Sequence, residues 1–149
     1  MSKKIFYSAV KGTKEISNGY QTGLQALGSN STKITVPDTR KLNGSVDIDS
    51  CVKDLYPTEN RWDYAIGYNE TAYFIEIHPA ETSSVTKMIA KVTWLKQWLK
   101  NQAPLMKKIK ASENPFQWVA SGRNAIVKGS KEAHKLSKSG IVITKGSFE

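Results

Sequence analysis

Residues 61–78 read Arg61-Trp-Asp-Tyr-Ala-Ile-Gly-Tyr-Asn-Glu-Thr-Ala-Tyr-Phe-Ile-Glu-Ile-His78. Two runs rich in aromatic and β-branched residues, 61–68 and 71–78, are separated only by Asn69 and Glu70. This pattern predicts a β-hairpin with a two-residue turn. In the register that such a turn sets, Asp63 faces Glu76 and Arg61 faces His78.

Alternate side chains of a strand point to opposite faces of its sheet, so the hairpin has two faces of different character. The core face is expected to carry Trp62, Tyr64, Ile66, Tyr68, Tyr73, Ile75 and Ile77. The opposite face carries Arg61, Asp63, Ala65, Gly67, Ala72, Phe74, Glu76 and His78. Because this second face is polar at one end and small at several other positions, we expect it to be open to a ligand.

Two carboxylates that face each other across a hairpin repel. With Cβ atoms about 5 Å apart, the repulsion between Asp63 and Glu76 is roughly 3 kcal/mol at an effective dielectric constant of about 20. A bound Mg²⁺ or Mn²⁺ ion would relieve it, and so would a raised pKa on one of the acids. The third alternative is a salt-bridge network in which Arg61 and His78 neutralise both acids.

Composition favours one basic domain. The chain has 149 residues, which is enough for a single domain spanning residues 1–149, and its formal net charge is +9. Such a charge favours polyanionic partners, nucleic acid first and acidic membrane surfaces second. The alternative is that the charge serves solubility alone.

Cys51 is the only cysteine, so no disulfide can form within the chain, and we expect it to be a small core residue. No run of residues is apolar and long enough to cross a membrane, and the first ten residues lack the apolar stretch of a signal peptide. We therefore expect a cytoplasmic protein without a membrane partner.

The remaining elements follow from helical periodicity and turn signals. Helices are expected at 14–27, from 47 or 49 to about 56, from 82 or 83 to about 100, at 105–110 and at 130–139. Strands are expected at 33–36, at 116–120 with a partner at 125–127, and at 141–144. Mixed hairpins and helical crossovers predict an α/β or α+β fold, with a central mixed β-sheet flanked by helices.

The order of these elements resembles the PD-(D/E)xK superfamily, the restriction-endonuclease-like nucleases. A helix precedes a hairpin that carries Asp63 and Glu76, and a long helix and further strands follow, so the resemblance covers residues 14–127. It implies a restriction-endonuclease-like core in which both acids hold Mg²⁺ or Mn²⁺, with Glu15 as an additional metal ligand. The metal would activate a water molecule against a phosphodiester bond.

The sequence departs from the family pattern at two positions. His78 stands where the family has lysine, and Trp62 stands where it has proline before the first acid. His78 could orient water or contact phosphate, while Lys87 or Lys91 on the following helix could supply the missing lysine.

Basic and aromatic side chains indicate a surface for nucleic acid. Lys87, Lys91, Trp94 and Trp98 share one face of the long helix, where lysine would pair with phosphate and indole would stack on bases. The alternative is that the tryptophans pack beneath a neighbouring element. Arg123 and Lys131 are further candidates for phosphate contacts, as part of a basic last third of the chain. That region carries Lys107, Lys108, Lys110, Lys128, Lys131, Lys135, Lys138 and Lys145, which could equally form a solvated face.

The sequence therefore predicts a metal-dependent nuclease. Asp63, Glu76, His78, Lys87 and Lys91 would be catalytic, and Asp63, Glu76 and Glu15 would bind the metal. The main alternative is a non-catalytic module of the same fold that binds nucleic acid or protein. A homodimer or an accessory protein partner is also compatible with the sequence.

Overall fold

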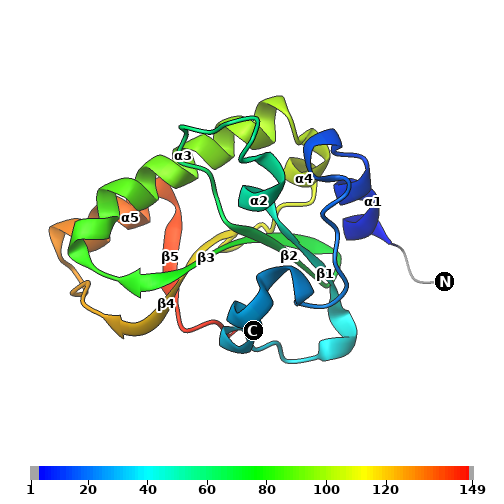
Figure 1. The fold of residues 1–149 in the computed structure, drawn as a ribbon. Coiled ribbons are helices and arrows are strands. Elements are labelled where there is room, and N and C mark those ends of the chain that lie inside the picture. Colours follow the sequence, from blue (N-terminus) through cyan, green and yellow to red (C-terminus); the bar gives the residue numbers. More distant parts are fainter. Residues whose placement is uncertain (1–3, 148–149) are drawn as a thin grey trace.

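A five-stranded mixed β-sheet forms the centre of the computed structural model, which describes residues 4–147 (Figure 1). Its strands are β1 (Leu42–Asp47), β2 (Tyr64–Tyr68), β3 (Thr71–Ala80), β4 (Phe116–Asn124) and β5 (Ile141–Thr144). They lie side by side in chain order. The first three are antiparallel, whereas β3, β4 and β5 run parallel. The expected α+β fold with a mixed central sheet is confirmed.

The β2–β3 hairpin has the register that the sequence predicts. Tyr64 pairs with Ile75 and Tyr68 with Thr71. Asn69 and Glu70 both have positive φ angles, of 52° and 58°, which is the requirement of the two-residue turn that matches strand twist.

The expected pairing of Arg61 with His78 is wrong, because β2 begins only at Tyr64. The chain has left the sheet by Arg61, whose Nε donates to Asp49 Oδ1 at 2.7 Å. Asp63, directly before the strand, stays beside Glu76 and donates its backbone N–H to Glu76 Oε2 at 2.7 Å.

Helices cover one face of the sheet and a short irregular segment covers the other (Figure 1). The α-helices are α1 (Ile5–Lys11), α2 (Ile48–Val52), α3 (Val85–Asn101), α4 (Pro104–Lys108) and α5 (Lys131–Ser139). Four 3₁₀ segments add η1 (Lys14–Ile16), η2 (Gln25–Lys33), η3 (Thr39–Lys41) and η4 (Thr82–Ser84).

Both faces of the sheet are therefore packed. The expected core face is confirmed from Tyr64 to Ile77: Ile66 and Ile75 are fully buried, and they share a cluster with Leu27 of η2. Trp62 was expected on the same face, and this is wrong: it is buried in the larger core of the opposite face, because it precedes the start of β2 at Tyr64. The opposite face was expected to be open to a ligand, and this is wrong over most of its length. Phe74 is fully buried in the larger core beneath the helices, as are Ala65 and Ala72.

Gly67 shows why the small residues do not form a ligand site. The ring of Phe6, from α1, lies so close to Gly67 that a Cβ added there would overlap it. The small side chains of this face thus allow helix α1 to pack closely on the sheet. Only the polar end of the face, which carries the acids, remains accessible.

The long helix matches its sequence pattern. It begins at Val85, because residues 82–84 form the 3₁₀ turn η4, and it buries Val85, Met88, Val92, Leu95 and Leu99. Pro104 ends it and starts α4.

Near the C-terminus, the Ser130 hydroxyl caps α5, and Gly140 follows it with φ 91° in the left-handed region. Within residues 4–147, no helix is both long and apolar enough to cross a membrane.

Several expected elements are wrong. The helix predicted at 14–27 is replaced by η1 and the first residues of η2, because the close approach of Gly19 to Cys51 and Val46 and the positive φ of Gly23 interrupt it. The strand predicted at 33–36 is a single bridge between Thr35 and Ser147. The helix predicted from Asp47 to about 56 keeps its cap but ends at Val52.

The second predicted hairpin is also wrong. Residues 121–124 were expected to turn, but they continue β4 alongside β3, so that Asn124 pairs with Ala80. Residues 125–127 form no strand.

Candidate functional site

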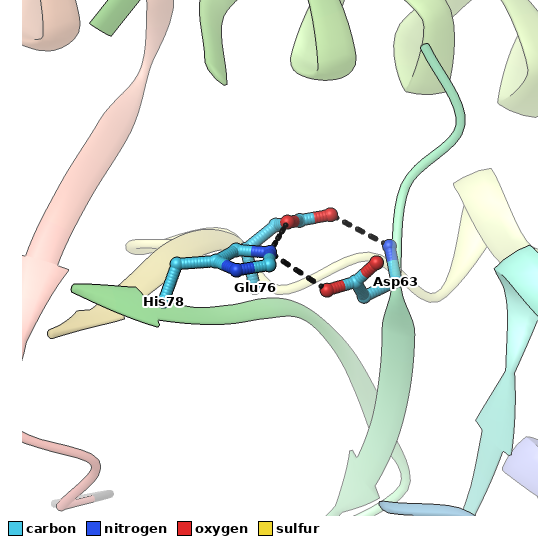
Figure 2. Close-up of side chains that lie close together, drawn as sticks. All are labelled: Asp63, Glu76 and His78. Carbon is cyan, nitrogen blue, oxygen red and sulfur yellow. Dashed lines mark hydrogen bonds and ion pairs between the residues drawn. The ribbon is translucent and has the colours of Figure 1, made fainter. Parts of the chain in front are cut away.

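Asp63, Glu76 and His78 converge at the accessible end of the sheet (Figure 2). Glu76 and His78 are two positions apart on β3 and so share a face, while Asp63 approaches from the start of β2. One ligand atom from each residue, two carboxylate oxygens and an imidazole nitrogen, lies within 4.8 Å of the others. Sequence reasoning predicted this grouping.

Hydrogen bonds fix both oxygens of Glu76. Its side chain is fully buried, with Oε2 accepting the backbone N–H of Asp63 and Oε1 lying 2.8 Å from His78 Nε2. The same Nε2 lies 3.0 Å from Asp63 Oδ2. His78 therefore bridges the two acids, as expected for it in the salt-bridge network that the sequence left open as an alternative.

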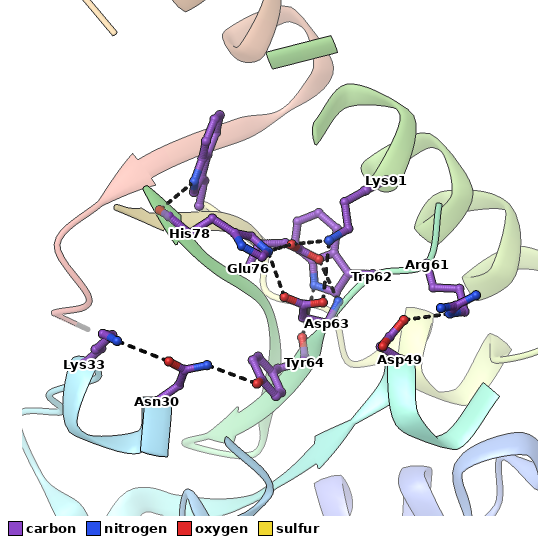
Figure 3. A network of polar contacts seen from close by, with 11 residues as sticks. Asn30, Lys33, Asp49, Arg61, Trp62, Asp63, Tyr64, Glu76, His78 and Lys91 are labelled. Atoms are coloured by element: carbon purple, nitrogen blue, oxygen red, sulfur yellow. Dashed lines mark hydrogen bonds and ion pairs between the residues drawn. The ribbon is translucent and has the colours of Figure 1, made fainter. Parts of the chain in front are cut away.

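Lys91 is the second cation of the cluster (Figure 3). Its Nζ donates to Glu76 Oε1 at 2.6 Å and lies 3.5 Å from Asp63 Oδ1. Its side chain is 12% exposed, so this ion pair is largely shielded from water. Of the two lysines that the sequence offered from the following helix, the structure brings Lys91 to the acids, whereas Lys87 is exposed.

Burial and the neighbouring charges shift the pKa values of Asp63, Glu76 and His78. Hydrogen bonds to Asp63 and Glu76 raise the pKa of His78 to about 9. Burial raises the pKa of Asp63, but the hydrogen bond from His78 and the charge of Lys91 outweigh it, and the net pKa is lowered. For Glu76, burial prevails and its pKa is raised. The repulsion between the acids is thus relieved by His78 and Lys91, not by Arg61.

A pocket of about 280 Å³ opens beside the cluster. Its lining includes His78, Glu81, Ser84, Lys87 and Lys91. A ligand in this pocket would contact two members of the cluster and the exposed Lys87. The site therefore combines metal-ligating groups, cations and access for a small group such as a phosphate.

Glu15 does not join these acids. Its carboxylate accepts hydrogen bonds from Tyr56 Oη and Trp98 Nε1, each at 2.9 Å. It therefore links η1 to α3, and it is not part of the group that could hold a metal among residues 4–147. The expected role of Glu15 as a metal ligand is not supported by its position.

The tryptophans of α3 pack against their neighbours. Trp98 is 3% exposed, and Trp94 stacks on it with ring centroids 5.8 Å apart while its other contact is the edge of Tyr56. For Trp98 the packing alternative is confirmed. Because Trp98 is buried, the two tryptophans do not form an exposed apolar patch of the kind that would favour a protein partner.

Arg123 and Lys131 lie outside the cluster. Arg123 is an exposed residue near the end of β4, not a turn residue, and Lys131 is the exposed first residue of α5. Neither forms an ion pair within the described part of the chain. Their expected phosphate contacts stay predictions.

Trp118 supports the site and was missed by sequence reasoning. Its indole N–H donates to the backbone carbonyl of His78 at 3.1 Å, and Trp118 pairs with Glu76 in the parallel β3–β4 ladder. A pairing between strands so distant in the chain has no local sequence signal.

Comparison with known protein families, with curated proteins and with solved structures gave no match to this chain.

Proposed function

We propose that the protein is a metal-dependent nuclease with a restriction-endonuclease-like core, which hydrolyses phosphodiester bonds of nucleic acid. The observation that carries this proposal is the convergence of Asp63, Glu76 and His78, with ligand atoms within 4.8 Å, beside Lys91 and an accessible pocket. Acids, a histidine and a lysine in one place are the groups that such chemistry uses.

The order of elements supports this core. Helix α1 precedes the strands β1 to β3, helix α3 follows, and β4 then pairs in parallel with β3. The acids lie on the central hairpin of this arrangement, as the resemblance implies. The α-helices before the hairpin are α1 and the short α2, and neither contains Glu15, which lies in η1.

The donor set fits a divalent cation. Two carboxylates suit Mg²⁺ and Mn²⁺, and an added imidazole favours Mn²⁺ over Mg²⁺. When bound, the ion would lower the pKa of a water molecule and polarise the phosphodiester. Asp63 and Glu76 would hold it, and Glu76 is kept in place by the Asp63 backbone N–H.

The neighbouring side chains have distinct roles in the proposed reaction. His78, which lines both the cluster and the pocket, would ligate the ion or orient the attacking water once it has lost its proton. Lys91 would stabilise negative charge that develops on the phosphate, and Lys87 would hold the substrate at the outer wall of the pocket. The net charge of +9 favours a polyanionic substrate.

A non-catalytic binding module is the second candidate, and one observation favours it. His78 and Lys91 already balance the charges of Asp63 and Glu76. Because its charges are already balanced, the cluster would be stable without a metal ion. Its presence would then be explained without a catalytic function.

Cleavage assays separate the two candidates. Wild type, Glu76→Gln, Lys91→Met and a control, Lys53→Met at the exposed residue that follows α2, would be incubated with DNA and RNA, single- and double-stranded, with and without Mn²⁺. We expect Mn²⁺-dependent cleavage by wild type and control, and losses of at least about 100-fold in the other two variants. If folded wild type binds nucleic acid but cleaves none of these substrates, the binding module is the correct function.

A further inference from the structure

A second groove, lined by four lysines, lies between α3 and α4. Lys96 and Lys100 come from α3, Lys107 from α4 and Lys110 from the segment that follows, while Phe116 at the start of β4 also lines it. The volume of the groove is about 430 Å³. Figure 1 shows α4 near the C-terminal end of α3, so the groove is built from both helices.

The charges of this groove are all of one sign. No acidic residue lines it, and none of its four lysines forms an ion pair with an acid between residues 4 and 147. By contrast, Lys91 is paired with two acids. Cations gathered around one concave surface repel one another, and an anionic ligand would remove that repulsion.

Two of the lysines are held in position without being neutralised. The Nζ atoms of Lys96 and Lys110 each lie 5.5 Å from the centroid of the Phe116 ring, and Lys96 also donates to the backbone carbonyl of Ser139 at 2.7 Å. These contacts limit side-chain motion but leave the positive charge available. A preorganised cation loses less conformational entropy when it binds a ligand.

The groove shares no residue with the acid cluster or its pocket. Phe116 pairs with Phe74 in the sheet, whereas His78 pairs with Ala120 further along the same ladder. Lys96 and Lys100 also lie further along α3 than Lys91, and Lys107 and Lys110 come after that helix. An anion in the groove therefore need not contact the metal-ligating residues.

We propose that this groove binds the phosphodiester backbone of nucleic acid. Lysine recognises phosphate as a point charge, and several lysines along a groove suit a chain of phosphates. Stable attachment to a membrane usually combines positive charge with apolar side chains that insert, but Leu99 and Phe116, which line the groove, are 2% and 4% exposed. The assignment does not depend on the proposed nuclease activity, because such a groove would also serve a binding module.

A binding measurement with a short labelled DNA duplex tests this assignment. Fluorescence anisotropy reports binding in the presence of EDTA, over a range of salt concentrations. EDTA removes the metal, so cleavage plays no part. One variant changes Lys96, Lys100, Lys107 and Lys110 to Gln. A control variant removes the same charge at four exposed lysines outside both sites and outside the basic last third of the chain, Lys11, Lys14, Lys41 and Lys53.

We expect the groove variant to bind at least about tenfold more weakly at low salt, with the slope of log K against log salt reduced by roughly three to four. The control should lose less than about threefold in affinity, and a variant with Arg at the four groove positions should bind like wild type. Equal losses of affinity in the groove and control variants would overturn the assignment, because the net charge of the protein alone would then explain the binding. No binding by wild type would also overturn it, as would a groove variant that loses affinity for phosphatidylserine vesicles but not for the duplex.

Discussion

The buried carboxylate of Glu76 accepts hydrogen bonds from two cations, and the contact with Lys91 is the shorter. The Nζ–Oε1 distance is 2.6 Å, against 2.8 Å to His78 Nε2. Glu76 is fully buried and Lys91 is nearly so. A charge in such a position depends on its partners, because water cannot replace them.

We therefore expect Lys91→Met to lower the free energy of unfolding by about 2 kcal/mol at neutral pH. Urea unfolding of the purified variant measures this. Lys87→Met, one turn earlier on α3 and exposed, is the matched control and should change stability by less than about 0.5 kcal/mol. Equal effects of the two substitutions would show that Lys91 does not stabilise Glu76.

His78 should make the stability of the metal-free protein depend on alkaline pH. Its pKa rises to about 9 in the folded protein, from about 6.5 in an unfolded chain. The folded state then holds the proton more tightly, so this stabilisation is complete below about pH 6.5 and is lost as pH rises through about 9. Wild type should lose stability across that range in EDTA. His78→Gln should show a flatter profile, and identical profiles would contradict the assigned pKa.

At the level of single residues, sequence reasoning found the acids and His78 but not all their partners. Strand alternation and a two-residue turn suffice to bring Asp63, Glu76 and His78 together. They do not show where the strand begins, and Arg61 was misplaced because β2 starts at Tyr64. Which lysine of α3 reaches Glu76 depends on how the helix packs on the sheet, which helical periodicity does not determine.

Among the elements, sequence reasoning missed α1 because this helix is stabilised by tertiary contacts, not by its own sequence. It has seven residues, too few to be stable alone, and it is held by the packing of Phe6 on Gly67. Similarly, Ser121-Gly-Arg-Asn124 reads as a turn in isolation, but pairing with β3 extends β4 through it. Long periodic elements such as α3 were predicted well because their apolar stripe alone specifies them.

The α1–sheet contact gives a prediction at the scale of elements. Gly67→Ala should lower the free energy of unfolding by about 1–3 kcal/mol, because the added methyl overlaps the Phe6 ring. The smaller Phe6→Leu side chain should recover part of this loss in the double variant, which a double-mutant cycle would reveal as coupling between the two positions. Additive effects in chemical denaturation would mean that Phe6 does not pack on Gly67.

In the whole molecule, packing and charge leave a few accessible regions with distinct chemistry. Both sheet faces are covered, yet Asp63 and His78 of the cluster remain partly exposed, and His78 lines a pocket beside it. The four-lysine groove between α3 and α4 carries positive charge that no acid pairs with in residues 4–147. The proposed metal centre and the proposed phosphate-binding groove are thus separate surfaces of one basic protein, which would allow it to hold nucleic acid at one surface while it acts at the other.

Thermal unfolding with and without millimolar Mn²⁺ tests most directly whether the acids form a metal site. Wild type, Glu76→Gln and a control with the exposed Glu113 changed to Gln would each be compared with themselves in EDTA. Saturating Mn²⁺ should raise the melting temperature of wild type and control by roughly 5 °C, and should leave that of Glu76→Gln unchanged. An unchanged melting temperature in wild type, or the same rise in Glu76→Gln, would contradict a metal centre at Asp63, Glu76 and His78.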